Sequence, residues 1–410
     1  MVNGETRPGD IAVTGVGLIT APGTGAEDFW QGMCAARPEV TEDPVLTGLP
    51  VNSSCRPEKF DPEQLLGGRL SRRLDRFTQL ALAAADQALL DARLDASQWR
   101  APRVGVVLGV GSNSIERYGE QFRLLDEGRA AHVSPRALPR SVPNMAAGEV
   151  AMRVNAQGPN FVTSSACASG ATAIGVARDL LRAGTCDVVL TGGSESVRTA
   201  MTAACFAQLG VLSDGSRGPV GCRPFDRDRT GFVLGEGAAV LVLETLEHAR
   251  NRRAPVRARL CGYGASTDAY HPTSPHPEGR GAEAAVLGAL ADAGLVPADI
   301  HHVNAHGTAT RAGDLIEAAM IGRVFAAAPP VTASKAMTGH CMGASAAIEA
   351  VVTVLTLQHQ TIPPVAGTTC VDPQADLNVV LDVPRAVPMR TALSTSFGFG
   401  GQNAALVFSV

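Results

Sequence analysis

The chain has 410 residues, of which 45% are hydrophobic and 18% are charged. This composition excludes a wholly disordered protein, and the length allows a large core and two or more units of about 100–200 residues. The formal net charge is −4, so the overall field does not favour nucleic acid or an anionic membrane, and an acidic partner would need a local basic patch.

Neither a membrane span nor a disulfide framework is expected. Apolar runs such as 237–243 are interrupted well before the roughly 18–20 residues that a membrane helix requires. Residues 1–6 lack the charged and apolar regions of a signal peptide, which favours a soluble cytoplasmic protein. The nine cysteines form an odd number with no C-x-x-C pair, which favours reduced thiols over disulfides or a zinc site.

Short apolar runs recur along the chain, and each leads through small residues into a helical stretch. Such unbroken runs are typical of strands that are buried on both faces of a sheet. In the first half they lie at 11–15, 104–108, 161–163 and 188–192, and in the second half at 258–262, 302–305, 331–334 and 404–408. Strands that alternate with helices predict an α/β fold.

The two halves show the same order of strand, small-residue turn and helix. The strand ending near Thr163 leads into a helix over 168–181, and the strand at Val331 leads through a similar turn into a helix over 344–357. Because helices of mostly small residues can be buried all round, both are expected to lie between sheets. We therefore predict a duplicated α-β-α-β-α layered core, with halves of residues 1–255 and 256–410 joined near 250–255.

A helix predicted over 69–90 carries four arginines at spacings of three and four, and hence on one face: Arg69, Arg72, Arg73 and Arg76. A solvated surface is the simpler interpretation of such a charge run. These arginines are nonetheless the best local candidate for docking an acidic partner. Segments 138–144 and 213–229 are predicted loops.

Three reactive side chains follow predicted strands. Cys167 lies between a strand and a helix, where free N–H groups and the helix dipole favour the thiolate, although a buried core thiol is an equally good interpretation. His306 and His340 occupy similar turns in the second half. Ligands bind at the carboxyl ends of strands in α/β sheets, so we expect these three residues at one site.

Other chemistries find little support. His301 and His302 would point to opposite faces of a strand with no carboxylate ligand nearby, so no metal site is predicted. The segments 15–17 and 109–111 lack the third glycine of a dinucleotide-binding loop, and no P-loop motif is present.

Four motifs follow one another along the chain: Ser165-Ala166-Cys167-Ala168-Ser169-Gly170, Asn304-Ala305-His306-Gly307-Thr308, residues 335–343 and residues 396–401. Together they resemble the elongating β-ketoacyl-[acyl-carrier-protein] synthases, which are thiolase-fold condensing enzymes of fatty-acid and polyketide synthesis. The resemblance extends from 13–15 to 400–403 and includes 223–226 and 231–237. It implies a thiolase-like fold.

The resemblance also implies roles for the site. Cys167 would take an acyl group from a carrier-protein thioester. His306 and His340 would stabilise the enolate formed when a malonyl thioester loses carbon dioxide. The other implied roles are an oxyanion contact and gating by Phe399, a charged network of Lys335, Asp314 and Glu317, and pantetheine contacts by Thr308 and Thr310. No metal or bound cofactor is implied, because the substrates are carried on the phosphopantetheine of acyl carrier protein.

Two other interpretations of the sequence stay open beside a β-ketoacyl synthase. A thiolase condenses without decarboxylation, but it needs a second reactive cysteine where this chain has residues 397–401. A chain-length-factor-like partner would be non-catalytic, but such partners typically lack the nucleophile. Ala309, Arg311 and Cys341 depart from common family versions, as does the alanine on each side of Cys167. Fatty-acid and polyketide pathways, and a homodimer or a heterodimer with a chain-length-factor-like homologue, remain open.

Overall fold

The computed structural model describes residues 10–112 and 115–410, so the segment 1–6 considered above lies outside the described residues. Within these ranges, no helix has the length and apolar character that crossing a membrane requires.

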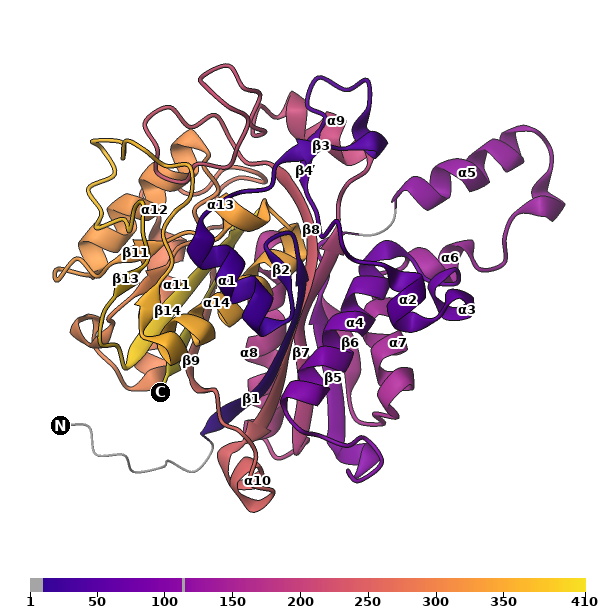
Figure 1. Cartoon of the computed structure of the whole chain (residues 1–410), viewed down its shortest axis with the longest axis horizontal. Helices are drawn as coiled ribbons and strands as arrows, with labels where there is room; N and C mark the ends of the chain where they lie inside the picture. The colour runs from indigo at the N-terminus through magenta and orange to yellow at the C-terminus, as the bar shows by residue number, and fades with distance from the viewer. Residues whose placement is uncertain (1–9, 113–114) are drawn as a thin grey trace.

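The described residues form a 13-stranded mixed sheet whose main path runs β11-β10-β14-β15-β9-β1-β8-β7-β5-β6 (Figure 1). The first half supplies β1 (Ile11–Thr20), β5 (Val104–Gly109), β6 (Asn160–Thr163), β7 (Val188–Ser196) and β8 (Leu234–Thr245). The second half supplies β9 (Ala258–Thr267), β10 (Val303–Asn304), β11 (Val331–Thr332), β14 (Thr391–Gly398) and β15 (Gln402–Ser409). The halves join where β1 pairs with β9.

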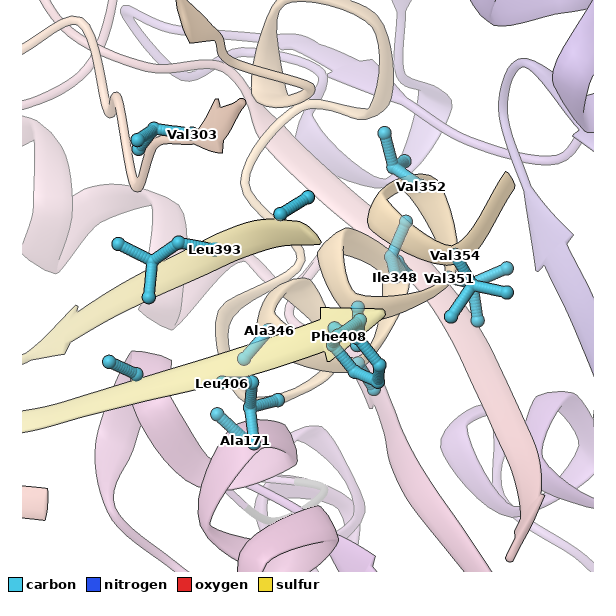
Figure 2. Close-up of a cluster of buried hydrophobic side chains, with 14 of the residues drawn as sticks. Ala171, Val303, Ala346, Ile348, Val351, Val352, Val354, Leu393, Leu406 and Phe408 are labelled. Atoms are coloured by element: carbon cyan, nitrogen blue, oxygen red, sulfur yellow. The ribbon is translucent and has the colours of Figure 1, made fainter. Parts of the chain in front are cut away.

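Two helices lie between the strands of the two halves. α8 (Ser169–Arg182) contacts β5, β7 and β15, and α14 (Ser345–His359) contacts β7, β8 and β14. Every residue of α14 from Ser345 to Leu357 is buried. Figure 2 shows Ile348 of α14 next to Phe408 of β15, and Ala346, near the start of α14, next to Leu406 of β15. The prediction of a helix buried all round between the two halves of the sheet is confirmed for α14, whereas α8 is buried along most of its length but exposes Asp179 near its end.

Further helices cover the outer faces. α4 (Arg76–Asp91) contacts β1, β8 and β7, and α7 (Met145–Val154) contacts β5 and β6. On the other side α11 (Arg280–Ala293) covers β9 and β15, with α12 (Arg311–Val324) beside it. This is the predicted duplicated layering of helix, sheet, helix, sheet and helix.

The remaining elements are shorter or peripheral, and α5 extends away from the body (Figure 1). They are β2 (Gly23–Thr24), α1 (Ala26–Ala35), β3 (Thr41–Glu42), β4 (Ser53–Cys55), α2 (Pro62–Leu66), α3 (Gly68–Ser71), α5 (Ile115–Asp126), α6 (Ala137–Ser141), α9 (Ala200–Gln208), α10 (Leu246–Asn251), α13 (Lys335–Thr338), β12 (Thr361–Ile362) and β13 (Arg385–Ala386). Residues 252–257 lead from α10 into β9, close to the predicted junction. The division of the chain at residue 255 itself stays a prediction.

Three local predictions are wrong. The helix over 69–90 is interrupted between α3 and α4, because the chain turns there to bury Leu74 and Asp75, whose carboxylate lies 3.7 Å from Arg140. The predicted loop 138–144 contains most of α6. Phe161 of β6 is 38% exposed because β6 is the last strand on the sheet path, so this strand is not buried on both faces. The predicted loop 213–229 is confirmed, since the described structure has neither helix nor strand there.

Candidate active site

The three predicted corners meet at one end of the sheet. Nε2 of His340 lies 3.1 Å from Sγ of Cys167, and the ring centroids of His306 and His340 are 5.8 Å apart and nearly perpendicular. Cys167 follows β6, His306 follows β10, and His340 lies between β11 and α14. The structure therefore brings the three residues together, and their catalytic roles stay a prediction.

The corners of Cys167 and His340 repeat the same backbone form. Cys167 lies in a 3-10 turn, Ala166–Ala168, that leads directly into α8, and the turn Met342–Ala344 leads directly into α14. Each turn begins with a residue in the left-handed region, Ala166 at φ 48° and Met342 at φ 41°. Non-glycine residues persist in this region when the surrounding structure holds them there, as is common at functional sites.

The Cys167 thiol is buried, and burial raises its pKa to about 11. The charge of Lys335 and a hydrogen bond from the Phe399 N–H act in the opposite direction but are smaller effects. The helix N-terminus favours the thiolate of Cys167, as the sequence indicates, but desolvation disfavours the charged form more strongly.

Two contacts set the tautomer of His340. The Met342 N–H donates to Nδ1 at 3.2 Å, and the Ser345 hydroxyl lies 3.0 Å from the same nitrogen. A ring nitrogen that accepts a backbone N–H carries no proton, so in the neutral ring the proton is on Nε2, which faces Cys167. Burial, with a contribution from Lys335, lowers the pKa of His340 well below its usual value and keeps the ring neutral.

His306 is oriented by Lys335. Nζ of Lys335 lies 3.2 Å from Nδ1 of His306 and also donates to the His306 carbonyl. Lys335 is fully buried and forms an ion pair with Glu349. Burial, followed by the charge of Lys335, lowers the pKa of His306 well below its usual value. The second imidazole is therefore also neutral, with its proton on Nε2.

The two predicted acidic residues hold the backbone around His306. Glu317 accepts the N–H groups of His306 and Gly307, each at 2.8 Å. Asp314 contacts neither histidine among the described contacts; it accepts the Phe225 N–H at 2.6 Å and lies 3.4 Å from Nε of Arg229. Within the predicted network, Glu317 therefore acts on the loop that carries His306 and Asp314 on the Phe225 backbone, whereas Lys335 contacts the His306 ring.

A cavity of about 750 Å³ opens onto Cys167, His306 and His340. One wall comes mainly from α9 and its neighbours, with Val197, Met201, Thr202, Cys205, Phe206 and Phe232. Another part is lined by Thr308 and Thr310, whose hydroxyls lie 3.0 Å apart. Phe399 also lines the cavity, and its ring centroid lies 6.2 Å from that of Phe206.

The four predicted docking arginines do not share one surface. Arg69, Arg72 and Arg73 are exposed around α3. Arg76, at the start of α4, pairs with the buried Glu236 at 2.8 Å, and its guanidinium lies over the Phe60 ring. Because the predicted helix is interrupted before Arg76, this residue lies apart from the three exposed arginines and forms an internal ion pair with Glu236.

Sequence reasoning missed several contributors to the site. Glu195, Ser345 and Glu349 are buried and contact the histidine or cysteine corners or their partners. A carboxylate within an apolar strand or helix is unusual, and this signal could have identified Glu195 and Glu349. Ser345 carries no comparable signal, because its contact depends on how the turn folds back. Among the described residues, no group of three or more His, Cys, Asp or Glu side chains could hold a metal ion.

Comparison with known proteins gives a consistent picture over the whole chain. Residues 9–249 match the family described as "Beta-ketoacyl synthase, N-terminal domain", and residues 257–369 match "Beta-ketoacyl synthase, C-terminal domain". A 3-oxoacyl-[acyl-carrier-protein] synthase 2 of Synechocystis is 38% identical over 406 residues, which is 97% of each chain. The solved structure "The ishigamide ketosynthase/chain length factor" matches with a TM-score of 0.91 and 31% identity, covering 98% of this chain and 99% of the other.

A further solved structure shows such a protein with a partner. Its title is "AntDE:AntF (apo): type II PKS acyl-carrier protein in complex with its ketosynthase bound to the hexaketide", and it matches with a TM-score of 0.88 and 28% identity. The match covers 98% of this chain and 100% of that one.

Proposed function

We propose a stepwise reaction in which each site residue has one role. The chain belongs to the β-ketoacyl synthase family and is a condensing enzyme of fatty-acid or polyketide chain elongation. One observation carries the proposal. Cys167 Sγ lies 3.1 Å from a neutral imidazole whose protonated nitrogen faces it, in a cavity that a second neutral imidazole also lines.

The first step is transfer of an acyl group to Cys167. The sulfur attacks the carbonyl of an acyl thioester, the carbon–sulfur bond to the pantetheine arm breaks, and the pantetheine thiol leaves with the proton lost from Cys167. Lys335 and the Phe399 N–H favour the thiolate and offset part of the desolvation. The new acyl chain lies along the α9 wall.

The second step is decarboxylation of a malonyl thioester. Its carbonyl oxygen accepts hydrogen bonds from the Nε2–H groups of His306 and His340, carbon dioxide leaves, and the electron pair moves into the enolate. Two neutral donors suit this task, because a fixed N–H aimed at developing negative charge stabilises the transition state without transferring its proton. Thr308 and Thr310 contact the arm that carries the malonyl group.

In the third step the enolate carbon attacks the acyl carbonyl on Cys167. The resulting oxyanion is stabilised by the backbone N–H groups of Cys167 and Phe399. Collapse of the intermediate expels the Cys167 thiolate, which takes up a proton from solvent to restore the thiol, and leaves the extended β-ketoacyl chain on the carrier. Phe399 gates the acyl part of the cavity, and no metal or bound cofactor takes part.

The substrates are delivered by an acyl carrier protein that docks through Arg69, Arg72 and Arg73. This proposal is supported by the exposure of these arginines and by the related ketosynthase that was solved with its carrier protein. A homodimer, or a heterodimer with a chain-length-factor-like homologue, is proposed by analogy with the relative solved as a ketosynthase and chain length factor. The reaction takes place in the cytoplasm.

The test separates acyl transfer from decarboxylation. Wild-type protein incubated with an acyl carrier thioester should gain the acyl mass, and Cys167→Ala should not. His306→Ala and His340→Ala should slow carbon dioxide release from malonyl carrier protein by roughly 10²–10³-fold, as expected for loss of an oxyanion donor. An acyl adduct that persists in Cys167→Ala, or equal carbon dioxide release in all variants, would remove these residues from their roles. Condensation without carbon dioxide release would instead favour the thiolase alternative.

A further inference from the structure

Glu195 is a buried carboxylate to which the reaction described above gives no task. It lies near the end of β7, is 2% exposed and, within the described residues, forms no ion pair with Arg or Lys. Oε2 accepts the N–H groups of Gly111 at 2.6 Å, Ser112 at 3.2 Å and Gly343 at 3.3 Å. Oε1 accepts the Ser112 hydroxyl at 2.9 Å. Both oxygens are therefore engaged with polar groups of other segments.

The chain is shaped to bring these segments together around the carboxylate. A Cβ on Gly343 would lie 2.3 Å from the Gly111 nitrogen and 2.8 Å from Oε2 of Glu195. A Cβ on Gly111 would lie 2.9 Å from the same oxygen and 3.2 Å from the Ala166 carbonyl. Because side chains at either position would collide with backbone or carboxylate, both glycines are needed for this approach. Glu195 thus joins a loop of the first half to a corner of the second.

The contact with Gly343 acts on His340. Gly343 directly follows Met342, whose N–H donates to Nδ1 of His340 and sets the tautomer. Met342 is in the left-handed region, so the direction of its N–H depends on how the flanking residues are held. Glu195 fixes the residue on one side of it, and Ser345 contacts the Cys341 N–H at 2.9 Å on the other.

The contacts with Gly111 and Ser112 act on the cavity. Both residues line it together with Ala166 and Cys167. The same carboxylate therefore fixes part of the cavity lining next to the nucleophile and the corner that orients His340.

We propose that Glu195 is a positioning residue for the acyl-transfer and decarboxylation steps, holding the Met342–Gly343 corner that directs the Nε2 proton of His340 and the Gly111–Ser112 segment that lines the cavity. This inference rests on the proposed function of His340. Glu195 touches neither of the reacting residues; its charge has a minor effect that raises the pKa of the Cys167 thiol, and its contacts act through the backbone that carries the reacting residues.

A glutamine can reproduce this arrangement. Its carbonyl oxygen can accept the three N–H groups, and its amide can donate to the Ser112 hydroxyl oxygen. A protonated Glu195 makes the same pattern, and burial raises the pKa of Glu195 to about 7, so the neutral form is populated at ordinary pH. Position rather than charge is therefore the property to test, with Glu195→Gln as the conservative variant and Glu195→Ala as the disruptive one.

The experiment measures carbon dioxide release from malonyl carrier protein, acylation of Cys167, and the ¹⁵N shifts of His340 in full-length protein. Glu195→Ala should lower carbon dioxide release by about 10²-fold, the usual cost of misplacing a catalytic group by about 1 Å. It should also move the His340 ¹⁵N shifts away from those of a pure Nε2–H tautomer. Glu195→Gln should stay within about threefold of wild type and keep these shifts.

A matched control uses another buried carboxylate far from the site. Glu244→Gln disturbs the contacts of Glu244 with Thr14, His248 and Arg252, so it should lower the melting temperature without changing the His340 shifts. If Glu195→Ala does not fold, Glu195→Asp, which withdraws the carboxylate by one methylene, replaces it.

The outcomes are distinct. Unchanged ¹⁵N shifts and near wild-type carbon dioxide release in the disruptive variant would overturn the positioning role, as would equal losses in Glu195→Gln and Glu195→Ala. A wild-type protein that is not acylated at Cys167, or that keeps decarboxylation in His340→Ala, would instead overturn the proposed function on which the inference rests.

Discussion

The buried pair of Lys335 and Glu349 allows stability and catalysis to be separated. Lys335 is fully buried, and Glu349 is 1% exposed. Replacing Lys335 with Met removes the cation but leaves the carboxylate buried and unpaired. Removal of one partner from such a pair typically costs about 3–5 kcal/mol in the free energy of unfolding.

The loss should depend on pH. Burial already raises the pKa of Glu349 to about 7, and Lys335 is the main opposing influence. In Lys335→Met the pKa of Glu349 should rise further. A carboxyl whose pKa is raised in the folded state binds its proton more tightly there than in the unfolded chain, so stability falls as pH rises from about 4.5 through the folded-state pKa. The destabilisation should therefore be larger at pH 8 than at pH 5.

Removing both charges separates the two roles of Lys335. Lys335→Met with Glu349→Leu should recover most of the stability, because apolar replacement of a whole buried pair is often neutral. It should not recover carbon dioxide release, because His306 still lacks the group that lies 3.2 Å from its Nδ1.

Urea unfolding at pH 5 and pH 8 measures the first effect, and carbon dioxide release from malonyl carrier protein measures the second. The reasoning fails if the single variant is as stable as wild type at pH 8. A double variant that regains wild-type carbon dioxide release would show that Lys335 has a structural role alone.

Two further predictions concern the nucleophile and the docking surface. Because the pKa of the Cys167 thiol is about 11, its alkylation by iodoacetamide should accelerate about tenfold per pH unit between pH 7 and 10, and a plateau already below pH 9 would contradict the desolvation argument. Arg72→Glu combined with Arg73→Glu should weaken carrier-protein binding at low salt in calorimetric titration, whereas Arg76→Ala should chiefly lower stability because it leaves Glu236 without one of its arginine partners. Unchanged affinity in the first variant would mean that this face is a solvated surface.

Local patterns predicted the layout of the core and the meeting of Cys167, His306 and His340, because strand–turn–helix corners place their residues at one edge of a sheet. Contacts between distant segments could not be predicted in the same way. Glu195 and Gly343 come together because β7 packs against α14, and the spacing of residues along the sequence does not reveal this packing. The break before Arg76 similarly depends on the burial of Leu74 and Asp75.

The thiol of Cys167 illustrates a different limit. Its position before a helix was visible in the sequence, and this local feature favours ionisation. Its depth of burial was not visible, and desolvation is the larger effect. The pKa therefore changes in the direction opposite to the one that the local argument predicts. Similarly, the apolar character of 161–163 does not reveal that β6 is the last strand on the sheet path.

The placement of α14 has a consequence for biosynthesis. This helix contacts β7 and β8. Strand β8 ends at Thr245, whereas α14 ends at His359, about 114 residues later. At about 5–20 residues per second, a ribosome needs roughly 6–23 s to make that stretch. During this interval the strands of the first half are complete while the helix that covers them does not yet exist. The nascent chain therefore has a defined window in which a chaperone, or a premature contact with another chain, would find this apolar face uncovered.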